Sequence, residues 1–298
     1  MEISIRITYD GLDADQHMLD MRRFGEAMLG LDKIVNTGLI VLSEYRFPIK
    51  GERFSLQIRA KEPSVGSFEF FAYMAPVAAS TLQLVLEMFY TMGSDILWRW
   101  TSWIVNMNGG RPKEAEPHFT VLMELTKEIH KSRAESEVAQ QAFFLEIADR
   151  LQYAAKGFVA PVGPSANSVA IEGRGQDDSR LLTHVDVPMA NAIRSKEKLE
   201  VGDMEKMRIR IDGLIHHNKQ LKVEHPDEPG RYISAVVRDP SFMEADNVYT
   251  RALARHGFLD ISAKPSHKAD GTIHTLYILD VKEVESVEPE ISPPEGQD

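Results

Sequence analysis

The first residues of the chain alternate between apolar and polar side chains, which predicts a half-buried β-strand. Isoleucines at every second position of residues 3–7 carry this pattern, and Asp10-Gly11 supplies a turn directly afterwards. From residue 20 to residue 42, apolar side chains recur every three or four positions, which predicts an amphipathic helix. Residues 53–60 and 67–73 have strand-like patterns again. We therefore expect an antiparallel sheet with a helix across it.

A long apolar segment follows these elements. Residues 70–86 carry no charge, and up to Trp98 the only charged side chains are Glu87 and Asp95. All three tryptophans of the chain come directly afterwards, with an arginine among them. Tryptophan and arginine at one end of an apolar segment are typical of a membrane–water interface. The candidate membrane-interface residues are Trp98, Arg99, Trp100 and Trp103.

Two interpretations of this segment stay open. As a helix, residues 82–107 have an apolar side and a polar side, which fits a buried helix of a soluble α+β domain. Glu87 and Asp95 favour that interpretation because carboxylates facing lipid are costly. In the other interpretation, the helix belongs to an oligomeric bundle in a membrane, and its polar side lines a water-filled pore. The candidate pore-lining residues are Gln83, Glu87, Thr91 and Asp95.

Breaks and further helices complete the N-terminal part. We expect a loop over residues 106–115, in which Pro112 stops any helix. Helices are predicted over residues 119–132 and 135–155, with Val138 among the apolar positions of the second. A second break runs through residues 157–178, which are rich in glycine, proline and serine. We expect a domain boundary between about residue 180 and residue 202, so the N-terminal domain covers residues 1–180.

The C-terminal part, residues 201–282, shows three strand patterns, one helix and two more strands. The helix runs from about Asn247 to His256 and ends at Gly257, a good left-handed C-cap. This order resembles that of an oligonucleotide/oligosaccharide-binding (OB) barrel. The predicted fold class is α+β, with an N-terminal antiparallel sheet, helices and an apolar helical segment, followed by a small five-stranded OB-like β-barrel.

Basic and aromatic side chains on the barrel strands indicate a groove for single-stranded nucleic acid, in which cations neutralise phosphates and a tyrosine stacks on a base. The alternative is a barrel whose outward positions are basic only for solubility, because this segment holds twelve basic and twelve acidic side chains. Lys206 and Tyr277 are further members of the proposed groove. The candidate ligand-binding residues are Arg208, Arg210, Lys219, Lys222, Arg231 and Tyr232.

Composition narrows the function classes. The 298 residues include no cysteine, which excludes disulfides and thiol catalysis. The formal charge is −11, and six acidic side chains without a base lie in residues 283–298, which we expect to form a solvated acidic tail. No catalytic, metal-binding or cofactor-binding signature is present, so we expect a protein that is not an enzyme, with no metal and no cofactor. A hydrolase with carboxylates at Asp177-Asp178 is the least favoured class.

Most of residues 1–282 resemble one family of poorly characterised bacterial proteins that includes the membrane-channel effector subunit of the Hailong antiphage system. The stretches that carry the resemblance are ISIRITYDGLDADQHMLDMRRFGEAMLGLDKI, PSVGSFEFF, FVAPVGPS, VDVPMANAIRSKEKLEVGDM and LKVEHPDEPGRYISAVVRDP. The resemblance implies a homo-oligomeric channel, held closed by single-stranded DNA oligomers from a partner nucleotidyltransferase. It also implies a place at the bacterial inner membrane or in the cytoplasm with membrane association.

These observations lead to two expectations for function. The first is an oligomeric antiphage effector, with a tetramer as one arrangement, that acts at the membrane as a channel and is gated by a single-stranded DNA oligomer or nucleotide. The alternative is a soluble oligomeric nucleic-acid-binding or scaffold protein without membrane activity. In that alternative the apolar helix serves as core or as an oligomer interface.

Overall fold

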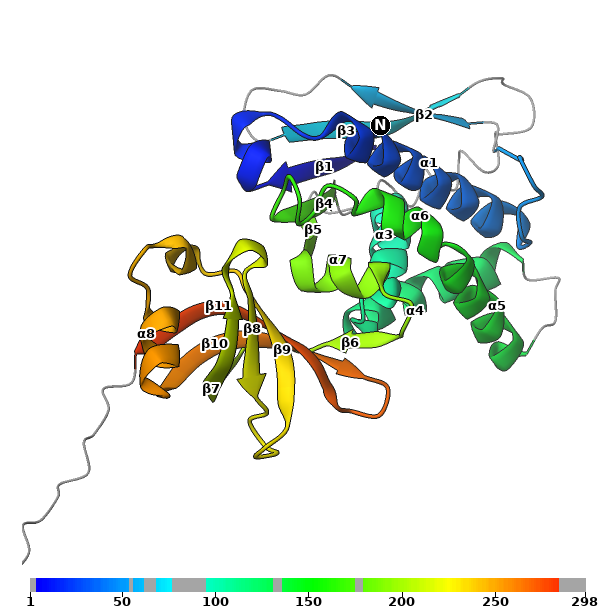
Figure 1. Cartoon of the computed structure of the whole chain (residues 1–298). Helices are drawn as coiled ribbons and strands as arrows, with labels where there is room; N and C mark the ends of the chain where they lie inside the picture. The colour runs from blue at the N-terminus through cyan, green and yellow to red at the C-terminus, as the bar shows by residue number, and fades with distance from the viewer. Residues whose placement is uncertain are drawn as a thin grey trace, which may run out of the picture. The chain divides into compact units, whose positions relative to one another are not determined.

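The chain divides into two compact units (Figure 1). The first unit ends at Val201 and the second begins at Gly202. Each has its own hydrophobic core, so each is described by itself. The structure, a computed structural model, describes residues 4–53, 56–61, 68–76, 95–130, 136–174 and 179–283.

The first unit contains a five-stranded antiparallel sheet with the strand order β2-β3-β1-β4-β5. The N-terminal strand β1 is central: Ile7 lies opposite Phe70 on one side and opposite Ile171 on the other. The alternation predicted for this strand is confirmed, because Ile5, Ile7 and Tyr9 are all buried in the core. The strands are β1 Ser4–Asp10, β2 Leu56–Lys61, β3 Phe68–Pro76, β4 Ser168–Arg174 and β5 Arg180–Asp186.

Helix α3 is the central helix of this unit. It contacts strands β1, β4 and β5 of the sheet, and helices α1, α4, α5, α6 and α7 pack around it. Helix α1 also packs closely on α6 (Figure 1). The first unit is completed by α1 Met21–Glu44, α3 Asp95–Asn108, α4 Pro112–Ile129, α5 Glu137–Arg150, α6 Gln152–Phe158, α7 Val187–Arg194, the 3-10 helix η1 Leu12–Gln16 and strand β6 Leu199–Val201.

Pro112 begins a helix instead of preventing one. The loop expected over residues 106–115 is wrong in both halves, because α3 continues to Asn108 and α4 starts at Pro112. Proline is well tolerated in the first turn of a helix, since its missing N–H would have no intrahelical partner there. Gly110, between the two helices, has to be a glycine. Its φ is 71°, and a Cβ there would clash with the carbonyl oxygen of Leu199.

The single helix expected over residues 135–155 is two helices. The chain turns at Leu151 between α5 and α6, and the Leu151 side chain is buried. Val138, expected on the apolar side, is 75% exposed. Ile147 is buried as expected, and Phe144, which was not among the expected apolar positions, is buried beside it. The periodicity predicted the helical state correctly and missed the turn, because no proline or glycine marks it.

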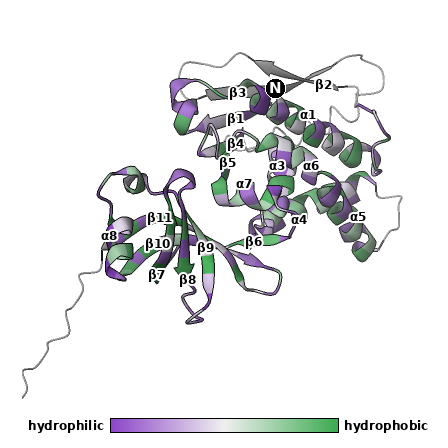
Figure 2. Cartoon of the chain, in the orientation of Figure 1, coloured by the Kyte–Doolittle hydropathy of each residue, from purple (hydrophilic) through white to green (hydrophobic). Residues whose placement is uncertain are grey.

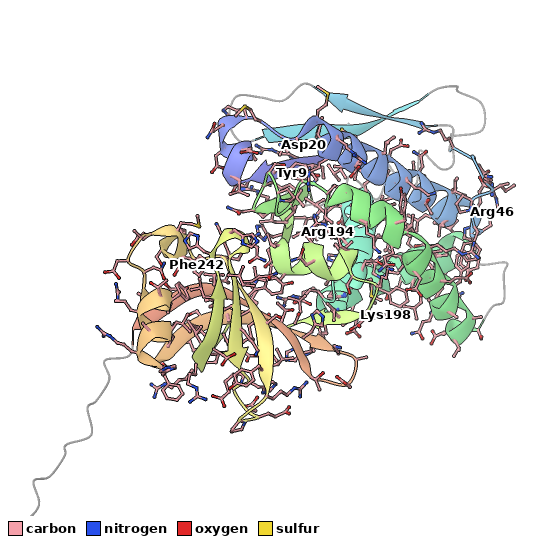
Figure 3. All side chains as sticks on the ribbon, in the orientation of Figure 1. Tyr9, Asp20, Arg46, Arg194, Lys198 and Phe242 are labelled. Carbon is pink, nitrogen blue, oxygen red and sulfur yellow. The ribbon has the colours of Figure 1, made fainter. Side chains whose placement is uncertain are left out.

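The break expected over residues 157–178 contains a strand of the sheet. Strand β4 lies within it, and β5 and α7 follow before Val201, all in the first unit. The irregular part is held by polar contacts: Tyr9 Oη donates to the Phe158 carbonyl at 2.8 Å. Arg194 donates to the carbonyls of Val159 and Val162 (Figure 3). A turn rich in glycine and proline therefore packs as part of the first unit.

The second unit is a closed five-stranded barrel with the order β7-β8-β9-β11-β10 and β10 pairing back to β7 (Figure 1). Strands β9 and β11 are parallel, and the other pairs are antiparallel. With helix α8 between the third and fourth strands, this is the order of an OB fold, as predicted. The elements are β7 Glu205–Ile215, η2 His216–Asn218, β8 Gln220–Glu224, β9 Tyr232–Val237, η3 Pro240–Met243, α8 Val248–Arg255, β10 Phe258–Lys268 and β11 Ile273–Glu283.

Side chains of the barrel strands alternate between core and solvent. Figure 2 shows that hydrophobic and hydrophilic residues both occur along these strands. Phe242 and Tyr249, from η3 and α8, are fully buried in the barrel core (Figure 3). Asn247 caps the start of helix α8, and its side chain accepts from Thr250 N. The left-handed residue at its end is His256, with φ 51°, so the expectation that Gly257 takes this conformation is wrong. Strand β10 then begins with an exposed residue, Phe258, followed by a buried one, Leu259.

Candidate nucleic-acid interface

The candidate interface is built on the outer face of strands β7, β8 and β9. Ile209 and Ile211 of β7 point into the barrel, so Arg208 and Arg210 between them point outward. On β8, Leu221 and Val223 are buried in the same core. The outward residues of β8 and β9 are Gln220, Lys222, Glu224, Tyr232 and Ser234.

Most of the predicted cations are in ion pairs. Arg208 Nε lies 2.8 Å from Asp260 Oδ1, and a second hydrogen bond joins its Nη2 to Oδ2 at 3.1 Å. This pair lowers the pKa of Asp260 and raises that of Arg208. The other pairs are Arg210–Glu224 at 2.8 Å, Lys222–Asp212 at 3.1 Å and Arg231–Glu228 at 2.7 Å. The acids cancel much of the positive field that a phosphate backbone would meet.

Lys206 and Lys219 differ from the other cations. Within the part of the chain that the structure describes, neither is in an ion pair. Lys219 ends the turn between β7 and β8 with φ 55°, and its carbonyl accepts from Val237 N at 2.8 Å. The backbone of Lys219 is therefore fixed at one end of the β8–β9 pair.

The predicted residues separate into several surfaces of the barrel. Arg210, Lys222 and Tyr232 lie together on the β7–β8–β9 face, and Lys219 is in the loop at one end of it. Arg231 is in the loop between β8 and β9. Lys206 and Arg208 instead border a shallow hollow of about 300 Å³ over β7, β10 and β11. The remaining polar side chains around that hollow belong to Asp260, Ser262, Asp280 and Lys282.

Tyr232 is the aromatic side chain of the proposed groove that solvent reaches. The residue is 39% exposed, and Lys222 Nζ lies 4.7 Å from the ring centroid in a cation–π contact. Tyr277 is only 5% exposed and therefore does not present a ring face for stacking. A tyrosine with a lysine over its ring combines a surface for a base with a cation for its phosphate.

Phe258 is an exposed aromatic side chain that sequence reasoning did not single out. It is 52% exposed at the start of β10 and lies directly opposite Arg210 of β7. The signal was present in the sequence: the apolar positions of this strand are Leu259, Ile261 and Ala263, so residue 258 has the outward parity. A large apolar side chain on the solvent side of a barrel strand is not explained by packing in the barrel core.

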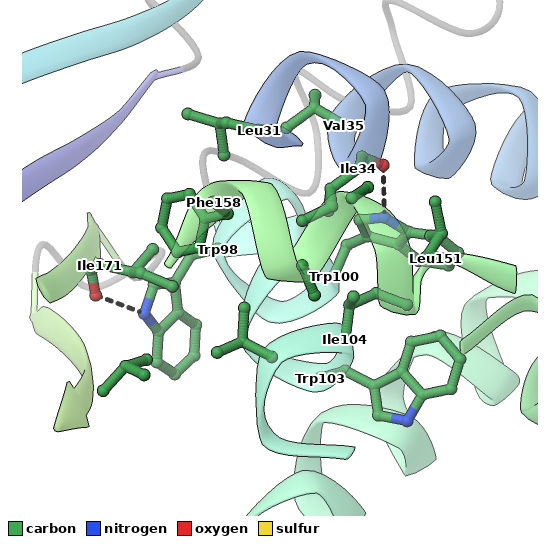
Figure 4. Close-up of a cluster of buried hydrophobic side chains, with 14 of the residues drawn as sticks. Leu31, Ile34, Val35, Trp98, Trp100, Trp103, Ile104, Leu151, Phe158 and Ile171 are labelled. Atoms are coloured by element: carbon green, nitrogen blue, oxygen red, sulfur yellow. Dashed lines mark hydrogen bonds between the residues drawn. The ribbon is translucent and has the colours of Figure 1, made fainter. Parts of the chain in front are cut away.

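The predicted membrane-interface tryptophans lie in the core of the first unit. Trp100 and Trp103 are 1% exposed and Trp98 is 6% exposed. Trp98 Nε1 donates to the Ile171 carbonyl at 3.1 Å, and Trp100 Nε1 donates to the Ile34 carbonyl at 2.9 Å (Figure 4). Buried indoles with satisfied N–H groups are typical of core packing.

Two glycines make room for these indoles. A Cβ on Gly38 of α1 would lie 2.5 Å from Trp100 Nε1, and one on Gly173 of β4 would lie 2.6 Å from Trp98 Cβ. Both positions therefore exclude any larger residue while the tryptophans keep their places. The close approach couples helix α3 to a helix on one side and to the sheet on the other.

The predicted polar stripe is only partly within the described residues. Gln83, Glu87 and Thr91 lie outside them, as do Asp177 and Asp178. Asp95 is half-buried and pairs with Arg99 at 2.9 Å, one helical turn further along α3. Among the helices that the structure describes, none is both long and apolar enough to cross a membrane.

His118 of α4 is the most strongly perturbed histidine among the described residues. Its ring meets the Trp98 ring edge to face at 4.7 Å, and it is 9% exposed. Burial, with a smaller contribution from the Arg99 charge, lowers the pKa of His118 to about 4. At neutral pH the imidazole is therefore uncharged.

These features define an α+β protein with an OB-like barrel as its second unit. The chain belongs to the family described as "Domain of unknown function (DUF7946)", whose model matches residues 5–194. A second model, "Family of unknown function (DUF7947)", matches residues 203–282, the barrel. No curated protein and no solved structure matches the chain.

Proposed function

We propose that this protein is an oligonucleotide-responsive effector whose barrel binds single-stranded nucleic acid on the outer face of β7, β8 and β9. One observation carries the proposal: exposed Tyr232 with Lys222 4.7 Å from its ring centroid, on the strand pair that OB folds use for ligands. Stacking on an exposed ring tolerates any base, and the adjacent ammonium group neutralises phosphate. Recognition of this kind needs no large positive field.

The charge balance of the barrel favours a selective ligand over general coating of nucleic acid. Arg210 and Lys222 are each paired with a carboxylate, so a phosphate must compete with Glu224 or Asp212 for them. We therefore expect weak binding to duplex DNA, which offers phosphates without free base faces. Single strands gain the stacking contribution as well and bind more tightly.

The direct test is fluorescence anisotropy of a labelled twelve-nucleotide oligothymidylate titrated with the full chain at low salt. Tyr232→Leu removes the ring and should weaken binding about tenfold, the size of one lost stacking contact. Lys222→Gln should reduce the slope of log affinity against log salt by up to about one.

The matched control is Lys198→Gln, an exposed lysine in the first unit. It makes the same change in net charge and should leave affinity unchanged. Absence of binding by the parent chain, or equal affinity of all three variants, would contradict the proposal.

We further propose, from the resemblance to bacterial antiphage effectors, that the first unit assembles into a homo-oligomer that responds to the bound oligonucleotide. The oligonucleotide would come from a partner nucleotidyltransferase. Light scattering after size exclusion, with and without the oligothymidylate, tests the assembly. A mass that corresponds to one chain under both conditions would contradict it.

Action at a membrane is a second proposal, carried by a feature of the sequence. Residues 77–94 hold a single charged side chain, Glu87, among eighteen. A helix of about that length approaches the thickness of a bilayer core. Fractionation of cells that express the untagged chain tests it: retention in the membrane pellet through high-salt and carbonate washes supports membrane action, and release by either wash contradicts it.

A further inference from the structure

We propose that Phe258 and Tyr232 are two separate base-stacking platforms, so that the barrel selects single-stranded oligomers over mononucleotides. This inference rests on the proposed function and deepens it, because it names a second contact residue and a minimum ligand length. It starts from a row of four outward side chains that crosses four neighbouring strands.

The row is fixed by strand register. Phe258 of β10 lies opposite Arg210 of β7, and Glu224 of β8 lies opposite Tyr232 of β9. Arg210 Nη2 and Glu224 Oε2 join the two halves at 2.8 Å. Along β10, β7, β8 and β9 the two aromatic residues are therefore three strand spacings apart, so about 14 Å of barrel surface lies between their backbones on this side.

Both ends of the row are exposed rings, whereas its centre is an ion pair. Phe258 is 52% exposed and Tyr232 is 39% exposed. Glu224 is held in place by Gly230, whose N–H donates to its Oε1 at 2.8 Å, so the central pair is anchored at its acidic end. Such a row presents two flat apolar surfaces with a fixed polar spacer between them.

Each ring has a cation beside it. Lys222 Nζ lies 4.7 Å from the Tyr232 centroid, and Arg210 is the cross-strand neighbour of Phe258. A nucleotide stacked on either ring would thus have a positive charge within reach of its phosphate. An aromatic ring with a cation beside it at both ends of the row suits a ligand with two or more nucleotides. A single nucleotide would use only one of the two rings.

The spacing sets the ligand length. Two rings on strands that lie about 14 Å apart along the barrel surface offer separate faces, so we infer that one base stacks on only one of them at a time. A stacked strand advances about 3.4 Å per nucleotide and covers that distance in about four steps. A more extended strand covers it in fewer. We therefore expect both platforms to be occupied once the oligomer reaches three to five nucleotides.

The test is a length series of oligothymidylates, from one to eight nucleotides, titrated into the full chain by calorimetry or by competition with the labelled twelve-mer. The parent chain should show a rise in affinity of about tenfold or more between two and five nucleotides. Phe258→Leu keeps an apolar side chain but removes the flat ring, so this rise should disappear while dinucleotide affinity stays unchanged.

Two controls separate stacking from a general effect on the barrel. Phe258→Trp should retain the rise, because it restores an aromatic face. Met243→Leu changes another exposed apolar side chain, 53% exposed on η3, and should leave the whole series unchanged.

A length series for Phe258→Leu that coincides with that of the parent would overturn this inference and leave oligonucleotide binding intact. If the parent chain binds no oligomer of any length, both the inference and the proposed function fail. Equal affinity of the parent for the mononucleotide and the eight-mer would overturn the two-platform arrangement alone.

Discussion

Single residues in the first unit determine how closely its elements pack. Gly38 and Gly25 lie on the same helix, but only Gly38 faces Trp100, with no room for a Cβ. We predict that Gly38→Ala destabilises the protein by about 1–3 kcal/mol through overpacking. Gly25→Ala, whose Cβ would meet no atom within 4 Å, should instead stabilise it by about 0.5–1 kcal/mol. Urea denaturation of both variants measures the difference, and effects of the same sign would contradict the packing described for α1 and α3.

His118 gives the first unit a pH dependence of defined sign. Its pKa is lowered to about 4 in the folded state, whereas the unfolded state binds the proton near the ordinary value of about 6.5. Between these values the unfolded state holds more protons, so this residue's contribution to stability is present above pH 6.5 and lost as pH falls towards 4. We predict that His118→Gln removes roughly 2–3 kcal/mol of the stability change across this window. Urea midpoints at several pH values measure it, and identical pH profiles of variant and parent would contradict the burial of this imidazole.

At the barrel surface, acidic residues restrain the cations that we assign to the ligand. Lys222 pairs with Asp212 while it lies over the Tyr232 ring. We predict that Asp212→Asn raises affinity for single-stranded oligothymidylate about two- to fivefold, because the ammonium group no longer has to leave a carboxylate. Glu146→Gln in α5 changes the net charge by the same amount away from the barrel and serves as the control. An equal gain in the control would assign the effect to net charge alone.

At the scale of elements, helix α3 connects the sheet to the helices around it. Its tryptophans make these contacts: Trp98 bonds to β4 and Trp100 bonds to α1. Because all three indoles are at most 6% exposed, we predict that acrylamide quenches their fluorescence weakly in the native protein and strongly in urea. Vesicles that carry brominated lipids should likewise leave the emission unchanged while α3 stays in the core of the first unit. Strong quenching by those vesicles would contradict this placement and favour the membrane-interface interpretation of Trp98, Trp100 and Trp103.

The sequence predicted elements whose period is regular and missed those defined by a single turn. The strand at the N-terminus, helix α1 and the barrel order follow from alternation and helical spacing, which depend on many residues at once. Strand β4 was missed because glycine, proline and serine dominate residues 157–167 directly before it, although Val169 and Ile171 alternate correctly. The turn at Leu151 and the left-handed His256 are not marked by a glycine or proline at the residue itself.

The candidate site was predictable in composition but not in arrangement. Sequence parity places Arg208, Arg210 and Lys222 on the outside of the barrel, and the structure agrees. Their acidic partners come from other strands, as Asp260 does for Arg208, and depend on register that a single sequence does not fix. The outward parity of Phe258 could be read from the sequence, but its place opposite Arg210 depends on the same register.

At the scale of the whole molecule, the two units have different chemical characters. The first has a large aromatic core, and its matched model covers residues 5–194. The second is a small barrel with twelve acidic and twelve basic side chains in residues 201–282 and exposed aromatic side chains on its outer strands. This division agrees with our proposal that the barrel is the ligand-binding unit.

The central claim is that single-stranded oligonucleotide binds the outer face of the barrel, and photo-crosslinking tests it most directly. An oligonucleotide that carries 5-iodouridine is irradiated with the full chain, and the crosslinked peptides are identified by mass spectrometry. We predict crosslinks on β9 and β10, at Tyr232 and Phe258, which are lost when unlabelled oligothymidylate is in excess. Crosslinks confined to residues 4–201, or none that the competitor removes, would contradict the account.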